Sequence, residues 1–217
     1  MPSKGSSHSS WTRCSRSTVF PRSAIFGGLA GVALCAALAG CFNEPEPAYR
    51  TVRPEDRVYL QDRDLETLPP VVATADYLNL DRNRLTSVEG VEKLVSLKWL
   101  RLNGNKLASL PDLSPLVNLR RLYLRDNRFT AVPETIKDLP ALTDLELSGN
   151  PIREIPEWLA QKKGLKNIAL NRTGIVKLPA DLSSWKTLQS LQLGDLNLPR
   201  EEMTRIRAAL PDVAIVF

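Results

Sequence analysis

The sequence predicts an α/β solenoid, in which short repeats stack and each repeat adds one strand to a parallel sheet. The first observation is a period of 20 to 23 residues that runs from residue 55 toward the C-terminus. The second is a pair of aliphatic residues, two positions apart, that recurs in every repeat. The third is that no cysteine follows position 41, so the stacked aliphatic side chains must hold the domain together without disulfides.

The aliphatic pairs show how each repeat is built. Alternate residues of a strand point to the same face, so each pair defines one short strand whose aliphatic side chains enter the core. Neighbouring repeats then bury these columns against one another, and we expect the strands to pair in parallel at a spacing of about 4.8 Å. The pairs are Val58/Leu60, Leu78/Leu80, Leu100/Leu102, Leu122/Leu124, Leu145/Leu147, Ile168/Leu170 and Leu191/Leu193.

The turn after each strand and the segment that returns to the next strand are also patterned. Proline follows the last apolar column in most repeats, as at Leu68 and Val132. Proline fixes φ and lacks an N–H group, so we expect these return segments to be 3₁₀, irregular or at most short helices. The turn slot holds Asn83, Asn105, Asn127 and Asn150 in four repeats, and Arg63, Thr173 and Leu196 in the others.

This LxxLxLxxNxL pattern resembles the leucine-rich repeat family over essentially all of residues 55–217. The resemblance implies about seven repeats in a curved, right-handed horseshoe, with the parallel strands on its concave face and the returns on its convex face. It also implies that the four asparagines point inward and hydrogen-bond main-chain groups of their own and the neighbouring repeat. The departures at Arg63, Thr173 and Leu196 indicate that this asparagine ladder ends toward both ends of the stack.

The last 19 residues, 199–217, are predicted to close the stack. Met203, Ile206 and Leu210 lie on one face of a helix predicted over 201–210, which begins with acidic residues. An apolar strand follows at 213–217. We interpret this helix and strand as a C-terminal cap over the open core of the last repeat.

Residues 1–40 read as an export signal, because they hold four basic residues, no acidic residue and an uncharged apolar run from Ala24. The run ends in Leu38-Ala39-Gly40-Cys41, which resembles a bacterial lipobox. That resemblance implies cleavage between Gly40 and Cys41 and a covalent lipid, including palmitate, on Cys41. The alternative is an uncleaved membrane anchor.

Residues 41–54 comprise the expected lipidated Cys41 and a flexible tether with three prolines. Lipoproteins that are retained in the inner membrane often have Asp directly after the lipidated Cys. This chain has Phe42 there, so we expect it to be sorted to the outer membrane. The expected organisation is a signal peptide at 1–40, a tether at 41–54, the repeat domain at 55–198 and the cap at 199–217. The expected location is the bacterial cell envelope, with the chain anchored to a membrane by its lipid.

Composition excludes several kinds of function. Of the 29 Lys and Arg, four lie in residues 1–40, and the remaining 25 nearly balance the 24 Asp and Glu, so we expect no nucleic-acid partner. His8 is the only histidine, which removes histidine-based triads and metal sites from the repeat domain. Asp144 and Glu146 share a strand face, but no pocket signal accompanies them. We therefore expect that the protein is not an enzyme and has no metal site and no cofactor beyond the lipid. We also expect a monomer.

Three positions of each repeat face outward on the sheet: the residue before the aliphatic pair, the one between and the one after. Tyr, Trp and Arg, which are enriched at interface hot spots, gather at these positions in the first four repeats. They predict that the concave face binds a protein or peptide. The candidate ligand-binding residues are Tyr59, Tyr77, Trp99, Arg101, Arg121, Tyr123 and Arg125. The third outward position, counted over all seven repeats, holds Gln61, Asp81, Asn103, Arg125, Ser148, Asn171 and Gly194.

Two alternatives remain open at the level of sequence. The same aromatic rings could stack on the sugars of a carbohydrate or of peptidoglycan. The protein could also be a structural envelope component, with the arginines and aromatics packing only against one another across the sheet.

Overall fold

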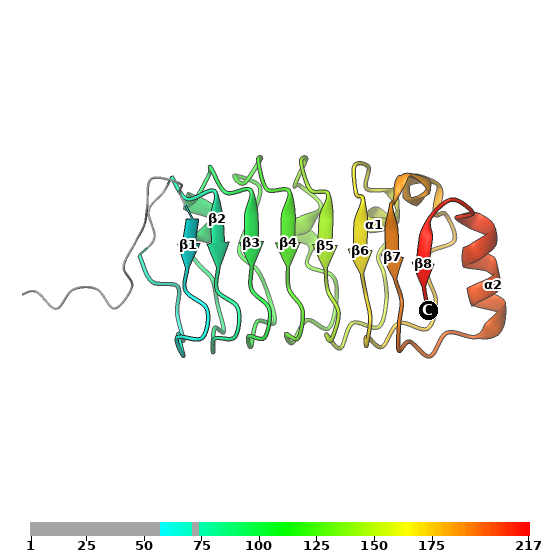
Figure 1. Cartoon of the computed structure of the whole chain (residues 1–217), viewed down its shortest axis with the longest axis horizontal. Coiled ribbons are helices and arrows are strands. Elements are labelled where there is room, and N and C mark those ends of the chain that lie inside the picture. Colours follow the sequence, from blue (N-terminus) through cyan, green and yellow to red (C-terminus); the bar gives the residue numbers. More distant parts are fainter. Residues whose placement is uncertain (1–56, 71–73) are drawn as a thin grey trace, which may run out of the picture. The chain divides into compact units, whose positions relative to one another are not determined.

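The computed structural model describes residues 57–70 and 74–217 of the 217-residue chain. Within them, eight parallel strands follow one another in sequence order and form one open sheet (Figure 1). This arrangement confirms the predicted solenoid. We keep the name concave face for the side of the open sheet that is turned away from the core. The strands are β1 (Arg57–Tyr59), β2 (Tyr77–Asn79), β3 (Trp99–Arg101), β4 (Arg121–Tyr123), β5 (Asp144–Glu146), β6 (Asn167–Ala169), β7 (Ser190–Gln192) and β8 (Ala214–Val216).

The register of the sheet follows the aliphatic pairs. The first member of every pair occupies the middle of its strand, is buried, and lies beside the corresponding residue of the next repeat, as Leu78 does beside Leu100. The second member continues the same inward column just after the strand, and Leu124 and Leu147 are fully buried there. The period of two along each strand therefore fixed both the face and the pairing.

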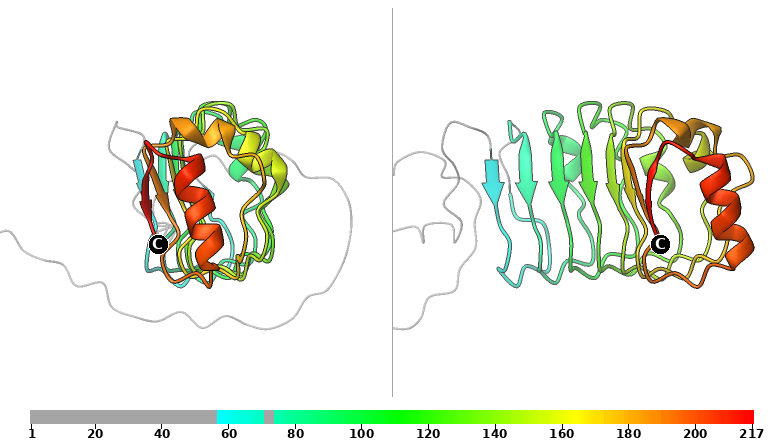
Figure 2. Two further views of the ribbon diagram at one scale, coloured as in Figure 1. Left: turned by 90° about the vertical axis from the view of Figure 1, so that its right-hand side faces the viewer. Right: turned by 45° about the vertical axis from the view of Figure 1, so that its right-hand side comes forward.

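The return segments lie on the side of the core opposite the sheet (Figure 2). They contain η1 (Val91–Lys93), η2 (Glu134–Ile136), α1 (Glu157–Gln161) and η3 (Ser183–Thr187). Pro133 and Pro156 immediately precede η2 and α1, in agreement with the expected 3₁₀ or short helical returns. Trp185 of η3 is fully buried and donates its indole N–H to the Leu159 carbonyl oxygen at 3.0 Å.

The four asparagines of the turn slot join adjacent repeats. Asn83 Nδ2 donates to the carbonyl oxygens of Leu60 and Leu80 at 2.8 and 2.9 Å. Its Oδ1 accepts the N–H groups of Arg63 and Leu65 at 3.0 and 3.1 Å. Asn105, Asn127 and Asn150 donate in the same way, and the Oδ1 of each accepts one main-chain N–H of the preceding repeat. Thr173 at the same slot donates one bond, from Oγ1 to the Leu170 carbonyl oxygen at 2.9 Å.

The residue before each turn slot adopts a left-handed conformation, a feature that the sequence pattern did not indicate. Gly104 and Gly149 have φ of 65° and 69°. Five residues with side chains adopt the same conformation at this slot: Asp62, Arg82, Asp126, Arg172 and Asp195, with φ between 53° and 58°. The N–H of this residue donates to a carbonyl of the next repeat, as Asp126 does to Ser148 at 2.9 Å, so the turn accepts local strain to keep the stack hydrogen-bonded.

Helix α2 (Arg200–Ala209) and strand β8 end the stack, as predicted for a cap (Figure 1). Ile206 and Leu210 are buried against the last repeat, and Met203 is half-buried. In the part of the chain that the structure describes, no helix is long and apolar enough to cross a membrane. The predicted signal peptide, Cys41 and the tether lie outside the described residues.

Candidate functional site: the concave face of the sheet

Three aromatic side chains form a row across the first three strands. The ring centroids of Tyr59 and Tyr77 are 5.2 Å apart, and those of Tyr77 and Trp99 are 5.7 Å apart. The Tyr77 and Trp99 rings are tilted by 59° to each other. Tyr59 and Trp99 remain 52% and 37% exposed, so the row presents large aromatic surface to solvent.

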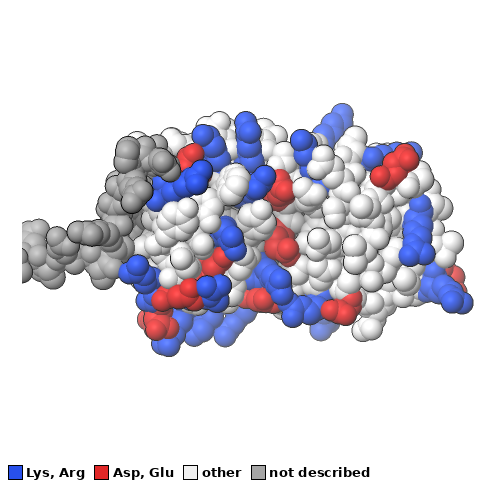
Figure 3. Space-filling model, in the orientation of Figure 1, with Lys and Arg blue, Asp and Glu red and all other residues white. Residues whose placement is uncertain are grey.

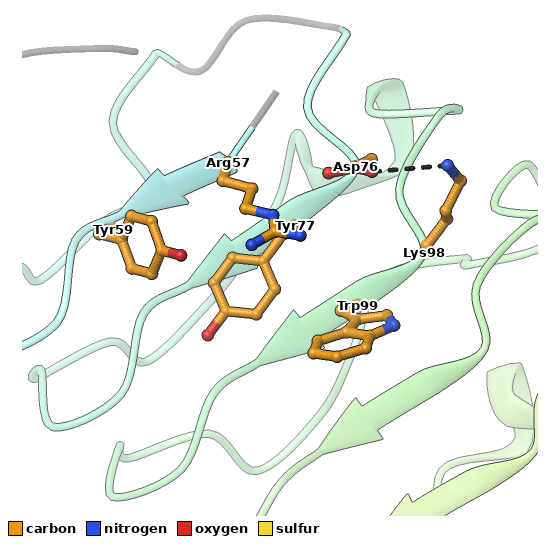
Figure 4. A pocket seen from close by; sticks show the side chains of 6 residues that line it. All are labelled: Arg57, Tyr59, Asp76, Tyr77, Lys98 and Trp99. Carbon is orange, nitrogen blue, oxygen red and sulfur yellow. Dashed lines mark hydrogen bonds and ion pairs between the residues drawn. The ribbon is translucent and has the colours of Figure 1, made fainter. Parts of the chain in front are cut away.

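These rings border a hollow of about 210 Å³ on the concave face, which we call the first hollow. Figure 4 shows the six residues that line it: Arg57, Tyr59, Asp76, Tyr77, Lys98 and Trp99. Lys98 Nζ lies 3.4 Å from Asp76 Oδ2, while Asp76 Oδ1 accepts no hydrogen bond from any described residue. Asp76 and Lys98 stand immediately before their strands, outside the three outward positions, so the sequence pattern did not include them.

The predicted arginines lie beside the aromatic row but are already engaged. The guanidinium carbon of Arg121 lies 4.1 Å from the Trp99 ring centroid, and Arg121 Nε is 3.7 Å from Asp144 Oδ2. Arg101 lies 5.6 Å from the Tyr123 ring centroid. The intramolecular cation–π packing considered from the sequence is therefore present.

Like Arg121, the other two predicted arginines pair with carboxylates. Arg101 Nη2 is 2.6 Å from Asp81 Oδ2, whose side chain is only 4% exposed. Arg125 lies in the turn after β4, where its Nε pairs with Asp126 Oδ2 at 3.2 Å, and it does not line the first hollow. The structure thus groups Tyr59, Tyr77 and Trp99 closely, sets Arg101, Arg121 and Tyr123 next to them, and leaves Arg125 at the edge.

The third outward position proves to be a structural ladder, and two of its residues, Asp81 and Ser148, are buried although the sequence pattern placed them on the outward face. A side-chain oxygen at this slot accepts the main-chain N–H of the same slot in the next repeat. Asp81 Oδ1 accepts from Asn103 at 2.8 Å, and Asn103 Oδ1 accepts from Arg125 at 2.9 Å. Ser148 and Asn171 continue the ladder, to Asn171 and Gly194 at 3.0 and 2.7 Å.

Neighbouring side chains complete this ladder where the slot cannot. Arg125 carries no acceptor, and Glu146 Oε1 accepts the Ser148 N–H at 2.9 Å instead. Asn79 Oδ1 accepts the Asp81 N–H at 3.0 Å in the same way, and Asn79 is buried. Every N–H in this slot from Asp81 to Gly194 therefore has a side-chain acceptor, which fixes the edge of the concave face.

A second hollow of about 180 Å³ lies over β4 to β7 and has carboxylates on its wall. Asp144 accepts hydrogen bonds from Thr143 Oγ1 at 2.6 Å and Asn167 Nδ2 at 2.7 Å. Glu146 stands beside Asp144 on the same strand, and buried Ala169 forms part of the lining. The repeat pattern did not predict this hollow, which lies where the small side chains of Ala169 and Ser190 follow the larger side chains of β4.

The charges on this face follow the two hollows. Figure 3 shows blue side chains over β1 to β4, red patches near the middle of the sheet, and a mostly white surface beyond them. Among the described residues, no group of three His, Cys, Asp or Glu side chains is placed to hold a metal ion. The face therefore offers aromatic, cationic and anionic contacts to a ligand.

Comparison with known proteins identifies other chains with the same fold. Residues 96–152 and 117–175 match the family model described as leucine rich repeat. An internalin from Listeria monocytogenes matches with 22% identity and a TM-score of 0.53, over 66% of this chain and 42% of its own. A TDR receptor matches with 26% identity and a TM-score of 0.59, over 72% of this chain and 29% of its own.

A leucine-rich repeat protein of Leptospira interrogans matches with 25% identity and a TM-score of 0.39, over 74% of this chain and 60% of its own. The chain thus spans less than two thirds of the length of each of these proteins. No curated protein sequence matches the chain. The fold is a leucine-rich repeat solenoid, and such domains generally act as protein-interaction modules and not as enzymes.

Proposed function

We propose that this domain binds a protein or peptide through the concave surface of β1 to β4. The observation that carries the proposal is the exposed row of Tyr59, Tyr77 and Trp99 around the first hollow. Aromatic rings bury a large area at a small cost in conformational entropy, and a partner that covered them would gain more than from any other part of this face. The cation–π contacts hold the ring of Trp99 in place before a ligand arrives, which lowers the cost of binding.

The opposite end of the sheet provides the internal contrast. The outward residues of β6 and β7 are Asn167, Ala169, Ser190 and Gln192, which are small or polar. Such side chains offer little area and are under-represented among interface hot spots. The same sheet therefore supplies both the proposed site and a surface that should contribute much less to binding.

A photo-crosslinking amino acid placed at Tyr59 tests the proposal in intact cells, with the same probe at Ser190 as control. Tyr59 is a suitable position because its side chain is exposed, whereas Asn79, its neighbour on β2, is buried and accepts the Asp81 N–H. We expect mass spectrometry to identify a protein that is captured at Tyr59 and captured much more weakly at Ser190. Equal capture at both positions, or glycan alone at Tyr59, would contradict the proposal.

We infer further that the chain is an exported lipoprotein of a bacterial envelope. The basic residues, the apolar run and the Leu38-Ala39-Gly40-Cys41 ending support cleavage after Gly40 and lipid on Cys41. The tether would then hold the domain away from the lipid surface, and Phe42 favours the outer membrane. Function at a membrane surface would bring the concave face close to partners in the envelope.

A further inference from the structure

The concave face carries two hollows of opposite character, and their separation specifies a ligand. The first hollow is lined by two cations, Arg57 and Lys98, and by one carboxylate, Asp76, which pairs with Lys98, whereas the second hollow has Asp144 and Glu146 on its wall. Cations outnumber anions among the outward residues of β1 to β4, where the one carboxylate, Asp81, is buried and paired with Arg101. On β5 both outward residues are acidic.

Arg57 is the cation of the first hollow that a ligand can use. Among the described residues its side chain has no ion pair and no hydrogen bond, whereas Lys98 is paired with Asp76 and Arg121 with Asp144. It stands at the exposed start of β1, beside the phenol rings of Tyr59 and Tyr77 (Figure 4). A carboxylate seated there would meet a guanidinium that no described residue pairs with, and could form a charge-assisted hydrogen bond beside the rings.

The second hollow has the opposite preference. Asp144 accepts bonds from Thr143 and Asn167, and Glu146 Oε1 accepts the Ser148 N–H, so the structure holds both carboxylates in fixed positions. The two groups face one opening, with Arg121 touching only Asp144. A positively charged side chain placed over the opening would be attracted by both carboxylates.

We propose that the concave face binds an extended polypeptide segment that carries an acidic residue about six positions from a basic residue. The spacing follows from the sheet, because β1 and β5 are four strand spacings of about 4.8 Å apart and an extended chain rises about 3.3 Å per residue. The acidic residue pairs with Arg57, the basic residue lies over Asp144 and Glu146, and apolar residues between them cover Tyr77 and Trp99. This proposal rests on the proposed function and gives its partner a chemistry. It uses charge order along the sheet as the specificity element.

Selection from a displayed library of random peptides on the immobilised full chain tests this directly. We expect enriched peptides to pair Asp or Glu with Lys or Arg at that spacing, about two- to fivefold above the unselected library, which is the fold-change of one surface ion pair. Arg57→Glu should replace the acidic preference at the first position by a basic one. Glu146→Gln keeps the acceptor for the Ser148 N–H and should weaken only the basic preference at the second position.

The outcomes separate this inference from the function on which it rests. Enriched peptides without paired charges, or an acidic preference that survives Arg57→Glu, would overturn the inference. If the combined Tyr77→Ala and Trp99→Ala variant no longer binds those peptides, the aromatic site binds peptides and the proposed function stands. If the parent chain enriches no peptide more strongly than the aromatic double variant does, both the inference and the proposed function are overturned. Thermal unfolding of each variant confirms that the sheet is intact.

Discussion

At the scale of single residues, two ladders of side chains control the turns at the edge of the sheet. The asparagine ladder satisfies main-chain groups inside the turn, and the third outward position satisfies the N–H at the end of each strand. The single side chain of Asn127, for example, hydrogen-bonds main-chain groups of two repeats, at Leu102, Leu124 and Leu107. A single amide side chain thus joins neighbouring repeats more directly than any one aliphatic residue does.

Asn127→Ala tests the asparagine ladder. The substitution leaves buried carbonyl and N–H groups without partners, which should lower the free energy of unfolding by about 1 to 3 kcal/mol. Urea unfolding followed by circular dichroism measures the change. Asn118→Ala is the control, because the Asn118 side chain is exposed and makes only one long bond, of 3.4 Å, to Val95. Equal midpoints for the two variants would contradict the ladder.

Gly149→Ala tests the left-handed slot. A Cβ at Gly149 would overlap Asp126 Oδ1, and Asp126 also pairs across this turn with Arg172 at 3.3 Å. Gly104 is the matched control, since it occupies the same slot with φ of 65° and a Cβ there would meet Arg82 atoms only at 3.5 Å or more. Both variants should lose about 1 to 2 kcal/mol from backbone strain, and Gly149→Ala should lose more. A smaller loss at Gly149 than at Gly104 would be inconsistent with the overlap.

At the scale of elements, the sequence predicted the strands correctly and the site only in part. The aliphatic alternation defines one face of each strand, and that information is local, so the pairing of Leu100 with Leu78 and Leu122 follows from it. The roles of Asp81 and Ser148 depend on an N–H in the next repeat, which a single repeat does not reveal. The first hollow depends on the diagonal contact between Tyr59 and Tyr77 and on Asp76 before the strand, and neither is part of the repeat pattern.

The cap helix α2 is joined to the last return by one buried carboxylate. Glu202 Oε1 accepts the Leu178 N–H at 2.9 Å and a bond from Arg205 Nη2 at 2.7 Å. Arg205 also donates to the carbonyl oxygens of Leu178 and Pro179 at 3.0 and 3.1 Å. The hydrogen bonds from Arg205, with that from Leu178, hold the pKa of Glu202 below its usual value.

Glu202→Gln therefore predicts a pH dependence. Because the pKa of Glu202 is lower in the folded chain, its contribution is complete above the unfolded pKa and is lost as pH falls through the folded pKa. The variant should be less stable than the parent by about 1 to 3 kcal/mol at neutral pH. The difference should shrink toward zero in acid, as measured by urea unfolding across pH. Exposed Glu201→Gln is the control, and a difference that stays constant with pH would contradict the role of the charge.

At the scale of the whole molecule, a solenoid with one charged and aromatic half presents a polarised concave surface. The stack keeps each strand in register, so residues far apart in the sequence, such as Arg57 and Glu146, lie on one continuous face. This is how a domain can have local charge of both signs although the basic and acidic residues after position 40 nearly balance. The proposed lipid anchor would add a fixed location to that surface.

Cys41→Ser tests the anchor. Without the thiol, no lipid can be attached, so we expect the variant to accumulate as a soluble or retained precursor while the parent partitions with membranes. Cell fractionation with immunoblotting measures the distribution. Cys35→Ser is the control, since bulky Leu34 stands before Cys35 where a lipobox has a small residue. Normal membrane partition of the Cys41 variant would contradict the lipoprotein assignment.

The central claim is that the aromatic half of the concave face makes the binding contacts. The most direct measurement is the affinity of the partner captured at Tyr59 for the full chain, for Tyr77→Ala with Trp99→Ala, and for Ser190→Ala with Gln192→Ala. We predict that the aromatic pair weakens binding by about 2 kcal/mol or more, the loss typical of hot-spot residues, and that the second pair weakens it by less than about 1 kcal/mol. Equal affinities for all three proteins, with folds intact, would contradict the account.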